Sequence, residues 1–371
     1  MISTCFSAAE RLETRLRSSS ADVLHGTSAL DVVVHIHPRH PQFDRGRLSR
    51  AGFDAHACRV LAGTSHHAGV ITYREALRRG ISPQAIRRHL ERGRWRRLHR
   101  GVYATFSGPL PRMAVLWAAL LAAGPGAVLS HETAAEAIGL SDRASDRVHV
   151  TIPADRRVVR PSGVRVHLSR RLEVARDPGS SLPRTRVEDT VLDLAATAAT
   201  LDAAIEWMAV ACERRRTTAA RLTSAMRLRA RVRWRHELSE ALDDIAGGCR
   251  SLLEIRYLRD VERAHGLPAG KRQARQVRLG GNIYDDVNYV GYGTVVELDG
   301  RLAHPASANH RDMCRDNVAA VRGDVVLHFG WSDVSNVPCR VAAQVAALLT
   351  DRGWMGVATR CRRNDCMIAK P

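Results

Sequence analysis

The sequence has no hydrophobic run long enough to cross a bilayer. Its longest apolar stretch, at 114–124, is well short of the roughly 20 residues that a membrane helix needs. The N-terminus lacks the charged region, apolar segment and small-residue cleavage site of an export signal. Eight widely spaced cysteines suit reduced thiols better than a disulfide framework. We therefore expect a cytoplasmic protein with no membrane partner.

Acidic residues are also scarce relative to basic ones. The 371 residues include 57 Lys and Arg against 38 Asp and Glu, which gives a formal net charge of +19. This balance indicates a polyanionic partner, and DNA is favoured over a membrane surface. Hydrophobic residues make up 45% of the chain, enough for two or three cores, so we predict an α/β multidomain protein. The sequence does not fix the number of subunits.

The first 104 residues divide into an arm and a compact segment. Residues 1–66 lack sustained periodicity, and we expect a flexible arm or an over-extended start codon. Residues 67–104 predict a winged helix-turn-helix, with short helices at 73–79 and 83–92 that begin at capping hydroxyl residues and end at glycines. A hairpin around Gly101 supplies the wing.

Arginine is concentrated in this predicted winged helix. Residues 74–100 contain ten Arg and two Glu. A solvated basic face is the alternative, but the arginines coincide with the element that would enter a DNA groove, so DNA contact is favoured. The candidate DNA-binding residues are Arg87, Arg88 and Arg92 on the second helix and Arg94, Arg96 and Arg97 on the wing.

Residues 105–245 alternate between helical and strand patterns, which predicts an α+β middle region. The expected helices are at 111–124, 130–140 with Ser130 as the cap, 183–196 and 200–213, and the expected strands are at 147–153 and 163–169. The strands carry His149 and His167, which we expect to be structural. The basic run at 205–237 has two interpretations, a helix along a phosphate backbone or a plain solvated helix.

Three phrases within 69–240 support a family resemblance: HRGVYA at 99–104, LSHETAAEAIGL at 129–140 and TVLDLA at 190–195. Through them the segment resembles actinobacterial proteins with a winged-helix domain of the abortive-infection AbiEi antitoxin type. In that family the winged helix binds operator DNA and represses its own toxin–antitoxin operon. The resemblance therefore implies a DNA-binding regulator. No toxin domain of the nucleotidyltransferase kind is recognisable.

Four carboxylates lie close together in YDDVNYVGYGTVVELDG at 284–300: Asp285, Asp286, Glu297 and Asp299. The VGYG loop predicts a hairpin that places Asp286 opposite Glu297. Strand periodicity puts Asp299 on the same face and Asp285 on the other. Because opposed like charges repel, we expect Mg²⁺ or Mn²⁺ to bind there. The alternative is a solvent-exposed edge strand.

The surroundings of this hairpin predict an α/β domain at 246–354. A helix with Glu254 in its first turn precedes three strands, a helix, a strand and a closing helix, which is the order of a small α/β nuclease core. The identifying residues are Glu254, Asp286, Glu297, Asp299-Gly300, His304, Arg311-Asp312, Arg315-Asp316-Asn317 and Gly330-Trp331. With them the domain resembles the Vsr-like group of the PD-(D/E)XK endonuclease superfamily.

This resemblance implies a restriction-endonuclease-like core that cleaves DNA phosphodiester bonds with a metal ion held by Asp286, Glu297 and Asp299. Many members have Lys at the position of Asp299. His304 is a candidate general base, with a structural role as the alternative. The remaining implied catalytic residues are Glu254, Arg311 and Arg315, the arginines stabilising developing phosphorane charge.

Two functions are therefore open. The protein is either a winged-helix DNA endonuclease or an antitoxin-type transcriptional regulator with a degenerate, non-cleaving nuclease-like domain. The intact carboxylates favour the first, and Asp299 in place of Lys favours the second. In the tail at 355–371, Cys361 and Cys366 lack a second pair at zinc-finger spacing, so we expect two free thiols.

Overall fold

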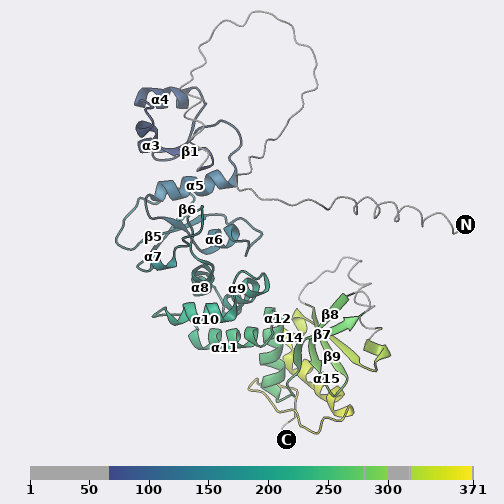
Figure 1. The fold of residues 1–371 in the computed structure, drawn as a ribbon. Helices are drawn as coiled ribbons and strands as arrows, with labels where there is room; N and C mark the ends of the chain where they lie inside the picture. The colour runs from purple at the N-terminus through teal and green to yellow at the C-terminus, as the bar shows by residue number, and fades with distance from the viewer. Residues whose placement is uncertain (1–66, 279–280, 300–316, 318, 370–371) are drawn as a thin grey trace, which may run out of the picture. The chain divides into compact units, whose positions relative to one another are not determined.

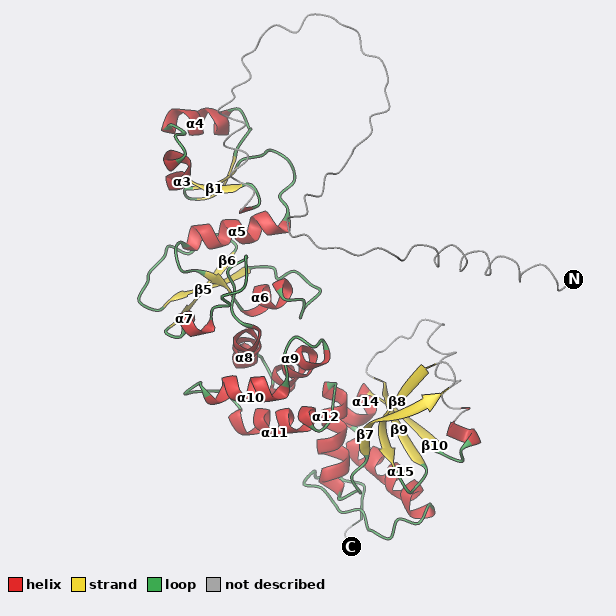
Figure 2. Cartoon of the chain, in the orientation of Figure 1, coloured by secondary structure: helices red, strands yellow, loops and turns green. Residues whose placement is uncertain are grey.

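The computed structural model describes residues 67–278, 281–299, 317 and 319–369. The described residues form a mixed α/β protein with several small sheets (Figures 1 and 2). The arm at 1–66 lies outside these ranges. So do three of the implied catalytic residues, His304, Arg311 and Arg315. Within the described ranges no helix is both long and apolar enough to cross a membrane.

The first segment folds as two short helices against a three-stranded sheet of order β1-β3-β2. Its elements are β1 (Val70–Thr72), α3 (Tyr73–Arg78), α4 (Pro83–Glu91), β2 (Arg96–His99) and β3 (Val102–Ala104). Thr72 Oγ1 accepts a hydrogen bond from the amide of Glu75 at 3.1 Å, and Ser82 caps α4 in the same way. The two predicted helices and the hairpin are confirmed. Strand β1 was not predicted, because its partner β3 is distant in sequence.

Residues 105–250 contain a second small sheet and a set of helices. The elements are α5 (Arg112–Ala123), β4 (Val128–Leu129), α6 (His131–Ala137), β5 (Val148–Pro153), β6 (Val164–Ser169), α7 (Leu172–Ala175), α8 (Val187–Thr197), α9 (Leu201–Glu213), α10 (Ala219–Arg227) and α11 (Arg235–Ala246). The predicted helices and strands are all present. Ser130 precedes α6, but its side chain makes no capping hydrogen bond.

Both interpretations of the basic run at 205–237 assumed one helix, and the structure differs on that point. The run does not form one helix, because residues 228–234 connect α10 to α11 and Trp234 adopts a left-handed φ of 54°. Several of its arginines donate hydrogen bonds within the protein. Arg233 Nη1 lies 3.0 Å from the carbonyl oxygen of Ala198, and Arg235 Nη1 lies 3.0 Å from that of Met226.

The last segment is a four-stranded sheet of order β10-β9-β8-β7 flanked by helices. Its elements are α12 (Leu252–Arg256), η2 (Tyr257–Arg263), β7 (Lys271–Arg278), β8 (Gly281–Tyr289), β9 (Thr294–Asp299), β10 (Val325–Gly330), α14 (Trp331–Asn336) and α15 (Pro338–Asp351). The β8–β9 pair is antiparallel, with Val287 opposite Val296 and Tyr289 opposite Thr294. This register and the four-residue loop agree with the predicted hairpin.

Strand β9 lies between β8 and β10, and β10 runs parallel to it. The central position explains why its first five residues are all buried, including Glu297. Val287, Val296 and Phe329 pack with η2 and α15 residues in one core, where Tyr257 is completely buried. The hydroxyl oxygens of Tyr257 and Tyr289 are 2.8 Å apart, so each phenol has a partner inside this core.

Candidate functional site

The winged helix presents its arginines to solvent. Ile86 on α4 packs in the core with Trp95 and Tyr103, so the opposite face of the helix is exposed. All six predicted DNA-binding residues are exposed: Arg87, Arg88, Arg92, Arg94, Arg96 and Arg97. In the part of the chain that the structure describes, none of the six forms an ion pair with a carboxylate. Their charge is available to phosphate.

Replacing Arg87, Arg88 and Arg92 together with Ala is expected to weaken DNA binding by about 10- to 100-fold near 0.1 M salt. The log–log slope of affinity against salt should fall by about three, because each lost phosphate contact removes roughly one. Fluorescence anisotropy titrations at several salt concentrations measure both quantities.

The matched control removes the same charge elsewhere, with Ala at the exposed positions Arg143, Arg157 and Arg160. This control should leave most of the affinity and slope intact, because its arginines lie outside the winged helix. Equal losses in the two triple variants would mean that net charge, and not α4, determines binding.

The carboxylate site begins at the N-terminus of α12. Ser251 caps the helix by accepting a hydrogen bond from the amide of Glu254 at 3.2 Å. The Glu254 carboxylate turns back, so that Oε1 accepts from Ser251 Oγ and Oε2 from the amide of Arg250, both at 3.1 Å. These contacts hold Glu254 in a fixed, buried position, with only 5% of its surface exposed.

Gln273 on β7 joins this carboxylate to the hairpin. Its Nε2 lies 3.4 Å from Glu254 Oε2 and 3.4 Å from Asp286 Oδ1. Asp286 Oδ2 also accepts a hydrogen bond from the amide of Leu298 on β9 at 2.9 Å. Gln273 has a φ of 49°, a left-handed conformation that is strained for a residue with a side chain. A helix and two strands thus converge here.

Val287 on β8 pairs with Val296 on β9. Asp286 precedes Val287 and Glu297 follows Val296, so both carboxylates come next to the same end of this pair. The structure connects two of the predicted site residues, Glu254 and Asp286, through Gln273, and Glu297 lies at the adjacent position of β9. Burial and the charge of Asp286 raise the pKa of Glu254 to about 7.

The other acidic residues of the hairpin, Asp285 and Asp299, make different contacts. Asp285 is buried and accepts a hydrogen bond from Asn288 Nδ2 at 2.9 Å. This fits its predicted place on the opposite face. Asp299 is exposed at the end of β9, where Oδ2 lies 3.6 Å from Nδ1 of His328 on β10. Gln273 was not predicted from the sequence. Its link between Glu254 and Asp286 depends on its left-handed backbone conformation and on two carboxylates that are far from it in the sequence.

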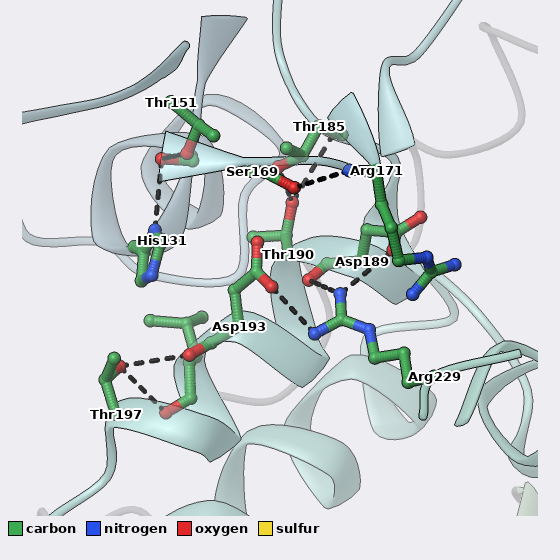
Figure 3. Close-up of polar contacts among 12 residues, drawn as sticks. His131, Thr151, Ser169, Arg171, Thr185, Asp189, Thr190, Asp193, Thr197 and Arg229 are labelled. Carbon is green, nitrogen blue, oxygen red and sulfur yellow. Dashed lines mark hydrogen bonds and ion pairs between the residues drawn. The ribbon is translucent and has the colours of Figure 1, made fainter. Parts of the chain in front are cut away.

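A second polar group lies in the middle region and involves the misinterpreted basic run. Figure 3 shows Arg229 reaching from the segment after α10 to Asp189 and Asp193 on α8. Its Nη2 lies 2.9 Å from Asp189 Oδ1, and its Nη1 lies 2.8 Å from Asp193 Oδ1. Burial raises the pKa of Asp193 despite this cation. An adjoining cavity of about 350 Å³ is lined by Thr151, Ser169 and Thr185, among others.

His149 and His167 are not isolated strand residues. His167 Nε2 lies 3.2 Å from His149 Nδ1, and the His131 ring stacks on that of His167 with centroids 3.8 Å apart. Glu132 Oε2 contacts His149 Nδ1 at 2.7 Å. Burial and the neighbouring histidine lower the pKa of His131 to about 3 and that of His167 to about 4. Both rings are therefore neutral at pH 7.

Comparison with known proteins identifies the first segment. Residues 64–105 match a family described as "Transcriptional regulator, AbiEi antitoxin". The match covers all of β1, α3, α4, β2 and β3. No curated protein matches the chain. The winged helix with its exposed arginines is therefore similar to the transcriptional-regulator domain of AbiEi antitoxins over residues 64–105.

Proposed function

We propose that this winged helix targets a metal-dependent DNA endonuclease domain at 246–354. The observation that carries the proposal is the link from Glu254 through Gln273 to Asp286, with Glu297 at the adjacent position of β9. The domain also has a helix, three antiparallel strands and a fourth strand parallel to β9, the element order expected for a restriction-endonuclease-like core. The order of helices and strands alone would not support an activity, because one fold can host many functions. The proposal therefore depends on the carboxylates.

The carboxylates suit a hard divalent cation. Mg²⁺ and Mn²⁺ favour oxygen ligands, and a cation beside Glu254 would favour its ionised form, whose pKa is raised by burial and by the charge of Asp286. Asp286 and Glu297 would hold the ion, with Glu254 beside them. When bound, such an ion stabilises phosphate charge and lowers the pKa of water. Asp299 is a further proposed ligand, at the exposed end of the same strand.

Residues of this chain would have the other roles in the reaction. Gln273 separates Glu254 from Asp286 and so positions both carboxylates. The arginines of the winged helix hold the DNA backbone. We propose His304 as the general base and Arg311 and Arg315 as cations that stabilise charge on the phosphate.

A second candidate function is a transcriptional regulator whose nuclease-like domain does not cleave. It is favoured by Asp299, which stands where the endonucleases that this domain resembles carry Lys. A carboxylate there cannot donate a hydrogen bond to an attacked phosphate or stabilise its negative charge.

A nicking assay separates the two functions. The full chain is incubated with supercoiled plasmid and Mg²⁺, Mn²⁺ or EDTA. The endonuclease predicts nicked or linear DNA with a metal ion and intact plasmid with EDTA, since the carboxylates need a counterion to act on phosphate. Protein that binds the plasmid but leaves it intact with either ion would reject the endonuclease in favour of the regulator.

A further inference from the structure

Four metal-binding side chains meet on the side of the last segment formed by η2 and α15, and none of them belongs to the carboxylate group. They are His265, Cys339, Cys361 and Cys366, and their ligand atoms all lie within 4.8 Å of one another. His265 follows η2, Cys339 is in the first turn of α15, and the other two cysteines come from the tail after α15. The tail is held at this place by a hydrogen bond of 2.8 Å from the Thr359 amide to the His265 carbonyl.

The distances match those of a tetrahedral metal ion. Cys339 Sγ and Cys361 Sγ are 3.5 Å apart, and Cys366 Sγ is 3.7 Å from His265 Nε2. Zinc bonds of about 2.3 Å to sulfur and 2.0–2.1 Å to nitrogen place neighbouring ligand atoms roughly 3.5–3.8 Å apart. A disulfide would need about 2.05 Å between the sulfur atoms.

The orientation of His265 supports the same conclusion. Its Nδ1 lies 3.0 Å from the carbonyl oxygen of Val261, so Nδ1 carries the proton and donates. Nε2 is then the atom with a free lone pair, and it is the one directed toward Cys366. Zinc-binding histidines are typically fixed in this way by a hydrogen bond from the other ring nitrogen. The imidazole is completely buried, which suits a structural position.

We propose that His265, Cys339, Cys361 and Cys366 bind a structural zinc ion that fastens the tail to the domain. Three sulfur ligands and one imidazole select zinc over Mg²⁺ or Mn²⁺, which prefer oxygen. Four protein ligands complete a tetrahedral shell and leave no position for substrate, so the ion has a structural role. The site is independent of the carboxylates and of the proposed cleavage.

The test is the metal content of the full chain, purified without chelator and measured by inductively coupled plasma mass spectrometry. One zinc ion per chain is expected. Changing Cys361 and Cys366 together to Ser should reduce the zinc content to near zero. Hydrogen exchange in peptides covering 355–369 should then increase, because the tail that includes Thr359 is no longer attached to the domain through the metal ion. Replacing the zinc with Co²⁺ in the unmutated chain should give the visible bands of a tetrahedral ion and thiolate charge-transfer bands.

Two controls fix the position of the ion. Cys212→Ser removes a cysteine outside the group and should keep the zinc. Glu297→Gln should also keep it, which distinguishes this site from the carboxylate site. A chain without zinc that gives no tetrahedral cobalt spectrum would overturn the proposal. So would zinc retained in the double Ser variant, or a Cys339–Cys361 disulfide found in the unmutated protein under reducing conditions.

Discussion

The Glu297→Gln variant is expected to lose metal-dependent nicking by at least about 100-fold, because it removes a proposed metal ligand from the carboxylate site. In the unmutated chain the melting temperature should rise with Mg²⁺ or Mn²⁺, since an ion that binds only the folded state stabilises it. The variant should lose this rise. Without metal it should be as stable as the unmutated chain or more so, because one of several repelling carboxylates has been neutralised.

Thermal melting with and without metal, together with plasmid nicking, measures these effects. Asp351→Asn, an exposed carboxylate at the end of α15, is the matched control and should change neither. A variant that melts lower without metal and still nicks DNA would show that Glu297 is held by structural hydrogen bonds. The loss of such bonds costs about 1–3 kcal/mol.

Replacing Arg229 with Met is expected to lower the free energy of unfolding by about 3–5 kcal/mol. The substitution keeps much of the side-chain volume but leaves Asp189 and Asp193 without their cation. Both carboxylates are largely buried. Removing their cation leaves two buried negative charges without compensation, and this lowers the free energy of unfolding. The segment that joins α10 to α11 also loses its attachment to α8.

Urea unfolding gives this free energy. Arg231→Met is the control, because Arg231 is exposed in the same segment and should change stability by less than about 0.5 kcal/mol. Adding Asp189→Asn and Asp193→Asn to Arg229→Met should restore part of the loss, because no unpaired charge remains. A change near zero in Arg229→Met would mean that water already compensates the two carboxylates.

The predictable parts of this protein have local causes. The helices of the winged helix begin at Thr72 and Ser82, whose side chains cap the following turns within three residues. The β8–β9 register was predictable because a four-residue loop and the alternation of apolar positions fix it together. The exposed arginine surface of the winged helix was predictable for the same reason, since all six residues lie within eleven positions.

The parts that could not be predicted depend on contacts between residues that are far apart in the sequence. From the sequence, Arg229 could have contacted phosphate or solvent, and its role depends on two aspartates that are 36 and 40 residues earlier in the chain. Gln273 gives no local signal, because its left-handed backbone is set by the surrounding sheet and helix. Cys361 and Cys366 looked unpaired because spacing rules consider near neighbours, while their other partners, His265 and Cys339, are far away in sequence.

The separation of 101 residues between His265 and Cys366 also sets an order of events during synthesis. At roughly 5–20 residues per second, a ribosome adds the last cysteine about 5–20 seconds after the histidine. All four strands of the sheet are made in that interval and have time to pair, since hairpins form in microseconds. The thiols therefore reach a domain that is already built. Closure of the proposed zinc site at this late stage would slow unfolding of the native protein and leave its rate of folding almost unchanged.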